Sequence, residues 1–334
     1  MKYKALGNTG LKVSELCLGA MTFGGEGIFR HVGDLGQKET TELVRLAIEA
    51  GINFIDTANV YSAGHSEELL GQALVDLGVD RDTMVLATKV RSPMGTGPND
   101  AGLGRKHILH QVEASLRRLK TDYIDLYQVH SYDPQTPMEE TLRTLDDLVR
   151  SGKVRYIGAS NMMAWQLMKA LAISQSDKLD KFISLQAYYS IAGRDLEREI
   201  VPFLQDQQLG LMVYAPLAAG LLSGKYTREN EGKAGGRRDM FSFPYVDKER
   251  AWTVLDVLRP MAEAKGVTVA QLSLAWLLHQ PVVTSIIIGA KTPAQLQENL
   301  KATGVRLSSE ERASLDMVSQ LPPEYPGWVM EYKA

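Results

Sequence analysis

The chain has 334 residues, and its hydrophobic content of 44% is ample for a sizeable core. It carries 37 Lys and Arg against 40 Asp and Glu, and its formal net charge of −3, with acids and bases interspersed, argues against a basic nucleic-acid-binding face and against an acidic scaffold tail. We therefore expect small-molecule partners and no nucleic acid.

The start of the chain, MKYKALGNTG, has no apolar signal region, and no run of about 18 consecutive apolar residues follows it. The one cysteine, Cys17, lies within an apolar run, which indicates a buried packing residue rather than a reactive thiol. We expect a cytoplasmic protein without membrane contact.

Residues 3–13 predict a β-hairpin with its turn around residues 8–10. Eight short apolar runs with the character of buried strands follow, at residues 15–19, 53–56, 84–89, 124–130, 155–160, 182–186, 211–215 and 284–290.

Segments with apolar residues at helical spacing separate these runs, for example residues 40–50, 108–119 and 138–149. Strands without polar alternation that alternate with helices indicate a parallel sheet covered on both faces, and eight such units predict a closed (β/α)8 TIM barrel. A doubly wound open sheet is the alternative, but no strand is followed by G-x-G-x-x-G.

The spacing stretches after the seventh strand, where residues 219–244 form a long polar, glycine-rich loop that suits a lid or ligand clamp. Its Arg237 and Arg238 are interpreted as solvated charges. Extra C-terminal helices are expected at about 248–265, 268–279 and 309–320, and the prolines of the tail at 321–334 are expected to prevent regular structure. No linker is visible, so residues 1–334 are interpreted as one domain.

The stretch INFIDTANVYSAGHSEELLG, residues 52–71, places Asp56 at the end of a strand and Tyr61 in the loop that follows. A buried carboxylate needs a partner, and Lys89 ends the next strand. We therefore predict that these three side chains form one proton-handling site. Ser66 is expected to cap the following helix, with Glu67 in its first turn.

Active sites of such barrels lie at the carboxyl ends of the strands. The other strand ends also carry polar or aromatic side chains, namely His130, Ser160 with Asn161, Gln186 and Tyr214. We expect all of them to converge on one mouth.

Six motifs, NFIDTANVYSAGHSEELLG, VLATKV, DLYQVHSYDP, GKVRYIGASN, VYAPLAAGLLSGKY and IIIGAKTPAQLQENL, resemble those of the aldo-keto reductase superfamily in order and spacing. The resemblance extends from residue 2 to about 320. It implies reversible reduction of an aldehyde or ketone to an alcohol by a reduced nicotinamide, usually NADPH.

The resemblance implies a catalytic tetrad of Asp56, Tyr61, Lys89 and His130. A carbonyl that accepts hydride needs a proton, and a free tyrosine, with a pKa of about 10, is a reluctant donor. Lys89 would stabilise the phenolate of Tyr61, Asp56 would keep Lys89 charged, and His130 would hydrogen-bond the carbonyl oxygen.

The resemblance also implies a nicotinamide site, in which Ser160, Asn161 and Gln186 hold the carboxamide and Tyr214 stacks beneath the ring. The implied pyrophosphate site consists of Leu217, Gly220, Ser223 and Lys225. The last motif supplies Gly289, Lys291 and Gln295 near the 2′-phosphate, and Glu298 and Asn299 near the adenine. A cation at Lys291 favours NADP(H) over NAD(H). No metal is expected.

Three other interpretations were weighed. The run from Gly220 to Lys225 is one residue short of a P-loop and is rejected as a triphosphate site. A nicotinamide-binding sensor or auxiliary subunit with little turnover is the first alternative function. A Schiff-base lyase that uses Lys89 is the second, although Asp56 argues against it. The substrate and the choice between monomer and homo-oligomer stay open.

Overall fold

The computed structural model describes residues 1–230 and 243–331, and its centre is a closed barrel of parallel strands. The first barrel strand, β3, pairs with the last, β10, through Cys17 and Ile287, which closes the sheet. The strands are β3 (Leu16–Gly19), β4 (Phe54–Asp56), β5 (Val85–Val90), β6 (Ile124–Val129), β7 (Val154–Ser160), β8 (Ser184–Tyr188), β9 (Gly210–Tyr214) and β10 (Val283–Ile288). The predicted (β/α)8 barrel is therefore confirmed.

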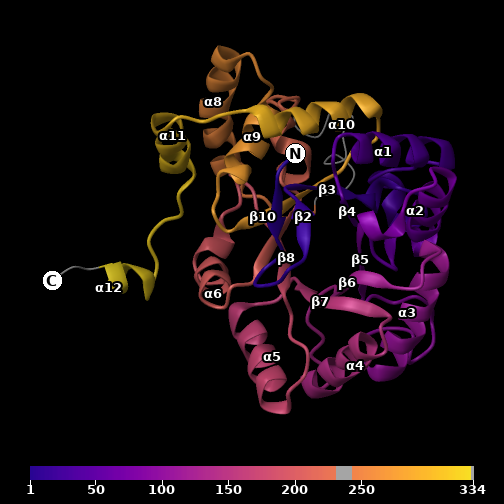
Figure 1. Ribbon diagram of the computed structural model, residues 1–334. Coiled ribbons are helices and arrows are strands. Elements are labelled where there is room, and N and C mark those ends of the chain that lie inside the picture. The colour runs from indigo at the N-terminus through magenta and orange to yellow at the C-terminus, as the bar shows by residue number, and fades with distance from the viewer. Residues whose placement is uncertain (231–242, 332–334) are drawn as a thin grey trace.

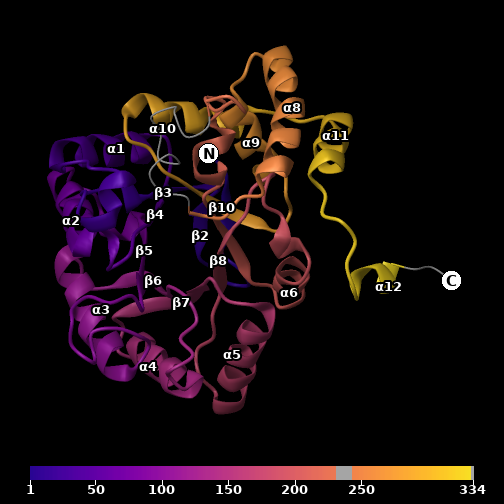
Figure 2. The same ribbon diagram turned by 180° about the vertical axis from the view of Figure 1, so that it is seen from behind.

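Helices surround the strands, and the two opposite views show them as an outer layer (Figures 1 and 2). The described part of the connection between β9 and β10 contains the two helices that the sequence predicts at about 248–265 and 268–279. The helices are α1 (Gln37–Glu49), α2 (His65–Asp76), α3 (Arg105–Leu119), α4 (Met138–Arg150), α5 (Ala164–Asp177), α6 (Ile200–Asp206), α8 (Lys248–Lys265), α9 (Val269–Leu278), α10 (Pro293–Leu300), α11 (Ser309–Ser319) and α12 (Gly327–Glu331). No helix in the described ranges is long and apolar enough to cross a membrane.

The predicted hairpin forms from β1 (Tyr3–Ala5) and β2 (Lys12–Ser14), and its Leu6 packs against apolar side chains inside the barrel. Gly7 allows this close approach, because it has a φ of +62° and a Cβ there would lie 2.3 Å from the carbonyl oxygen of Ile183. The hairpin thus packs against the amino-terminal side of the barrel and leaves the carboxyl ends of the strands open.

Two local predictions are wrong. Ser66 does not cap α2, because the helix begins at His65 after Gly64, and the Ser66 hydroxyl instead donates to the carbonyl oxygen of Ala20 at 2.8 Å. The tail contains the short helix α12, since its prolines all precede Gly327. This helix projects away from the barrel (Figure 1), and the Trp328 side chain is 51% exposed.

Outside the barrel, Glu67 of α2 is fully buried between β5 and α3. Its carboxylate accepts hydrogen bonds from Arg118 Nε at 2.7 Å, Thr88 Oγ1 at 2.5 Å and Ser115 Oγ at 3.2 Å. Burying a charge is costly unless it is paired, so these contacts hold α2 and α3 against the strand that carries Lys89.

Replacing Arg118 by Met is expected to lower the free energy of unfolding by about 3–5 kcal/mol, because the Glu67 carboxylate stays buried without its cation. Arg105→Met is the control, since it removes an exposed ion pair with Asp147 and is expected to cost under about 1 kcal/mol. Urea unfolding of both variants measures the difference, and equal losses would contradict the assignment.

Candidate active site

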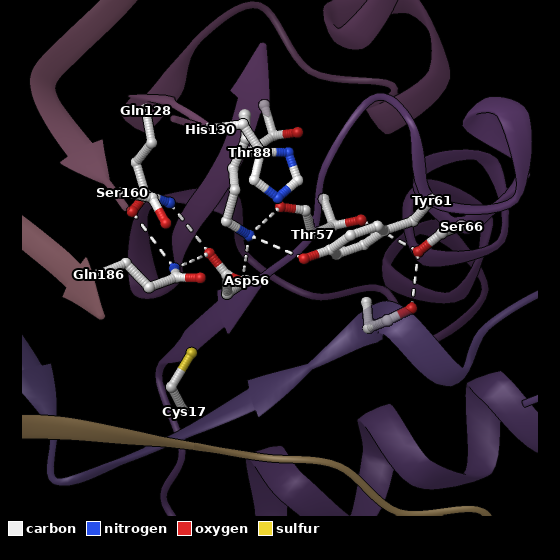
Figure 3. A network of polar contacts seen from close by, with 12 residues as sticks. Cys17, Asp56, Thr57, Tyr61, Ser66, Thr88, Gln128, His130, Ser160 and Gln186 are labelled. Carbon is white, nitrogen blue, oxygen red and sulfur yellow. Dashed lines mark hydrogen bonds and ion pairs between the residues drawn. The ribbon is translucent and has the colours of Figure 1, made fainter. Parts of the chain in front are cut away.

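A buried ion pair lies at the carboxyl end of the barrel, where β4 and β5 run side by side. Lys89 Nζ is 2.5 Å from Asp56 Oδ2, and the side chains are 0% and 3% exposed (Figure 3). The ammonium also donates to the Thr57 carbonyl oxygen at 2.8 Å and to Tyr61 Oη at 3.4 Å. The structure therefore brings together the three side chains that the sequence predicts as one proton-handling site.

The charge state of Lys89 follows from these neighbours. Burial alone lowers the pKa of the ammonium, but the Asp56 carboxylate and the Tyr61 hydroxyl outweigh it and raise the pKa above its usual value. Lys89 is therefore a cation at physiological pH.

Tyr61 reaches Lys89 from a tight loop between β4 and α2. Within η3 (Tyr61–Gly64), Ser62 and Ala63 have φ values of 48° and 56°, and Gly64 has 100°. Such backbone angles are strained for residues other than glycine. The hydroxyl of Ser62 donates to the Phe23 carbonyl oxygen at 3.2 Å, which fixes the loop and directs the phenol toward Lys89.

His130 directly follows β6, and its ring meets the Tyr61 ring edge-on at 5.8 Å between centroids. Burial, with the charges of Lys89 and Arg91, lowers the pKa of His130 from 6.5 to about 3. The imidazole is therefore neutral at physiological pH and can donate one N–H to a ligand. Its Nδ1 atom is buried and makes no hydrogen bond within the described residues.

A cavity of about 730 Å³ opens above these side chains. Asp56, Tyr61 and His130 line it, whereas Lys89 lies beneath its floor. All but Ser223 and Glu298 of the predicted cofactor residues line it too, namely Ser160, Asn161, Gln186, Tyr214, Leu217, Gly220, Lys225, Gly289, Lys291, Gln295 and Asn299.

Hydrogen bonds fix the polar side chains that form one wall of the cavity. Asn161 has a φ of 51°, donates to the carbonyl oxygen of His130 and to Ser160 Oγ at 3.0 Å each, and accepts from the Tyr214 hydroxyl at 2.9 Å. Gln186 donates its amide to Asp56 Oδ1 at 2.9 Å. The amide groups of this wall are thus fixed in direction before any ligand binds.

Two lysines line the cavity, Lys225 after η6 (Ala218–Ser223) and Lys291 before α10. Neither makes an ion pair in the part of the chain that the structure describes. Two positions before Lys225, Ser223 does not line the cavity, and its Oγ is buried without a hydrogen bond within the described residues. Unpaired cations with an unsatisfied hydroxyl suit the phosphates of a dinucleotide. The residues present therefore fit a nicotinamide dinucleotide.

Several side chains beside the cavity are not predicted from the sequence. Ile28 and Phe29 of η2 (Gly27–His31) line the cavity, and the Phe29 ring lies 5.5 Å from that of Tyr61. An apolar pair inside a glycine-rich loop after the first barrel strand is the signal that could have revealed them. Phe243 lies parallel to Tyr214 at 6.2 Å between ring centroids.

The predicted loop is only partly described, since residues 231–242, including Arg237 and Arg238, lie outside the described residues. Cys17 is buried below the site, and burial raises the pKa of its thiol well above the usual value, which fits the predicted packing role.

Comparison of the sequence with known proteins identifies the family of this chain. The Aldo/keto reductase family matches residues 15–320. The chain is 39% identical to "Uncharacterized oxidoreductase YrpG" of Bacillus subtilis, with 93% of each chain covered. It is 38% identical to a "Probable voltage-gated potassium channel subunit beta" of Arabidopsis thaliana, with 91% of this chain and 92% of the relative covered. It is 36% identical to "Versiconal hemiacetal acetate reductase" of Aspergillus parasiticus, with 93% and 95% covered. The chain therefore belongs to the aldo/keto reductase family of oxidoreductases.

Proposed function

We propose that this protein is an NADPH-dependent oxidoreductase that reversibly reduces an aldehyde or ketone to an alcohol, with Tyr61 as the proton donor. The observation that carries the proposal is the buried contact of Lys89 with both Asp56 and the Tyr61 hydroxyl at the floor of the cavity. The family and the versiconal hemiacetal acetate reductase relative support carbonyl reduction.

The proposed cofactor contacts follow the two ends of the cavity. The amide wall of Ser160, Asn161 and Gln186 would receive the nicotinamide, and Lys225 and Lys291 would hold the phosphates. The amide nitrogen of Gln186 is already engaged by Asp56, so its carbonyl oxygen is the atom that remains to accept from a carboxamide. When bound, the reduced nicotinamide supplies a hydride to the carbonyl carbon.

Proton transfer falls to the chain's own residues. As negative charge develops on the carbonyl oxygen, the O–H bond of Tyr61 breaks and the new alcohol O–H bond forms. The Lys89 ammonium stabilises the phenolate that is left, and Asp56 balances the charge of Lys89. Neutral His130 would donate a hydrogen bond to the same oxygen and orient it toward Tyr61.

A second candidate function is a nicotinamide-binding sensor subunit. The relative named as a potassium channel subunit beta favours it. The two candidates differ in turnover, because a sensor would bind NADPH tightly and reduce no member of a broad panel of aldehydes and ketones.

Tyr61→Phe is expected to lower kcat by at least about a hundredfold, because it removes the proton donor and keeps the ring. NADPH affinity should stay within about twofold, since Tyr61 is not among the residues that we propose to hold the cofactor. Tyr189→Phe is the matched control, because it removes a buried hydroxyl that donates to Glu197 away from the cavity. Turnover that survives in the Tyr61 variant would exclude the assignment.

Lys291→Glu is expected to weaken NADPH binding roughly ten- to a hundredfold and NADH binding far less, since only NADPH carries a 2′-phosphate. Fluorescence titration with each nucleotide measures the two affinities. Lys301→Glu makes the same charge change on an exposed residue outside the cavity and should leave both nearly unchanged. Equal losses for the two nucleotides in the Lys291 variant would refute the 2′-phosphate contact.

His130 gives the stability a pH dependence of known sign. Its pKa is about 3 in the folded chain and about 6.5 when unfolded, so protonation favours the unfolded state as the pH falls from 6.5 toward 3. Over that range, protonation of His130 is expected to lower the free energy of unfolding by up to about 1.4 kcal/mol per pH unit. Urea unfolding of the wild type and of His130→Gln measures the difference, and identical pH slopes would show that His130 is not buried in its neutral form.

A further inference from the structure

The second oxygen of Asp56 has its own partners. While Oδ2 contacts Lys89, Oδ1 accepts from Gln128 Nε2 at 3.0 Å and from Gln186 Nε2 at 2.9 Å (Figure 3). Gln186 Nε2 also lies 3.3 Å from Gln128 Oε1, so the three side chains close a ring of hydrogen bonds. Gln128 is fully buried, and the proton-transfer scheme above assigns it no role.

Chemistry fixes the direction of both amides. An ionised carboxylate only accepts hydrogen bonds, so each glutamine must present its NH2 group to Asp56. A reversed amide at Gln128 would place its carbonyl oxygen against the carboxylate, and the two would repel each other. The orientation therefore does not depend on how amide nitrogen and oxygen are distinguished.

The neighbouring strands accommodate the Gln128 side chain in the barrel interior. Asp56, Gln128 and Gln186 come from the alternate strands β4, β6 and β8, as the side chains of one interior layer do in such barrels. Gln128 is also paired in register with Lys89 on β5. The neighbouring position on β7 is Gly158, where a Cβ would lie 3.2 Å from Gln128 Cγ, so a glycine leaves room for the glutamine.

The direction of the carboxylate matters because Lys89 depends on it. A buried ion pair is favourable only with good geometry and with its remaining lone pairs satisfied. If Oδ1 were unsatisfied, the Asp56 carboxylate could rotate, and the Lys89 ammonium would move with it relative to the Tyr61 hydroxyl, which is already at the long distance of 3.4 Å.

We propose that Gln128 is a positioning residue for proton transfer: by holding Oδ1 of Asp56, it keeps the Lys89 ammonium directed at the Tyr61 hydroxyl. This inference rests on the proposed function and adds a residue to it. Gln128 touches neither the cavity nor a substrate, and no bond to it forms or breaks. Gln186 shares the same carboxylate and also lines the cavity, so it connects the cavity wall to the ion pair.

Two variants of Gln128 test the inference. Gln128→Met keeps the length and removes the donor, and is expected to lower kcat about tenfold, with KM and NADPH affinity within about twofold. Gln128→Glu is expected to be poorly active at alkaline pH, where two carboxylates meet, and to recover relative to the wild type on acidification. A proton held between the carboxyls then restores a donor to Asp56.

The matched control is Gln166→Met. Gln166 is also buried, but its amide oxygen accepts from the backbone of Met163 at the start of α5. This variant is expected to lose stability and to keep the wild-type pH profile. Wild-type kcat and pH profile in Gln128→Met would overturn the inference. An equal fractional loss of kcat at every pH in Gln128→Glu would also overturn it. A loss of NADPH affinity in parallel with kcat would do the same, because either result indicates that Gln128 contributes only to packing.

A readout without turnover separates this inference from the proposed function. The phenolate absorbance of Tyr61 is obtained as the difference between each chain and the same chain carrying Tyr61→Phe. In Gln128→Met its titration is expected to move to higher pH, since the cation is less well directed at the phenol. An unmoved titration overturns the inference. A moved titration in a protein that reduces no carbonyl refutes the reductase function alone.

Discussion

The arrangement of the site depends on one constraint, which is that a lysine and an aspartate are buried together at the end of a barrel. Taking two charges out of water is costly, and their attraction offsets that cost only when every remaining donor and acceptor is satisfied. Lys89 meets this condition through Asp56, Thr57 and Tyr61, and Asp56 meets it through Lys89 and two glutamine amides. The phenol is thus one of the groups that make the buried charge tolerable.

The barrel satisfies these donors and acceptors because several of its strands place side chains around the buried ion pair. Strands β4, β5, β6 and β8 each contribute one member of the network, and the loop that carries Tyr61 adds a strained backbone. Rigid strands therefore fix the charges, and a tight loop fixes the phenol that we propose as the proton donor.

Much of this could be predicted from the sequence because the signals are local. Apolar runs mark the strands, and polar residues that follow such runs, such as Asp56 and His130, must meet at one end of a parallel barrel. Gln128 gives no such signal, because the role that we propose for this glutamine within a strand depends on its partners on β4 and β8. The predicted capping role of Ser66 is wrong for the same reason, since its hydroxyl donates to the carbonyl oxygen of Ala20, which is far away in sequence. The surroundings of both Gln128 and Ser66 are set by contacts between segments that are distant in sequence.

The same geometry bears on the alternative chemistry of a buried lysine. A Schiff-base nucleophile needs a neutral amine with a free lone pair and access to the substrate carbon. Lys89 is held as an ammonium by Asp56, its contacts engage the backbone of Thr57 and the hydroxyl of Tyr61, and it lies beneath the cavity floor. Both of its side-chain partners, Asp56 and Tyr61, line the cavity. This placement fits the proposed role of Lys89 as an electrostatic support for proton transfer, since the Tyr61 side chain and not Lys89 lines the cavity.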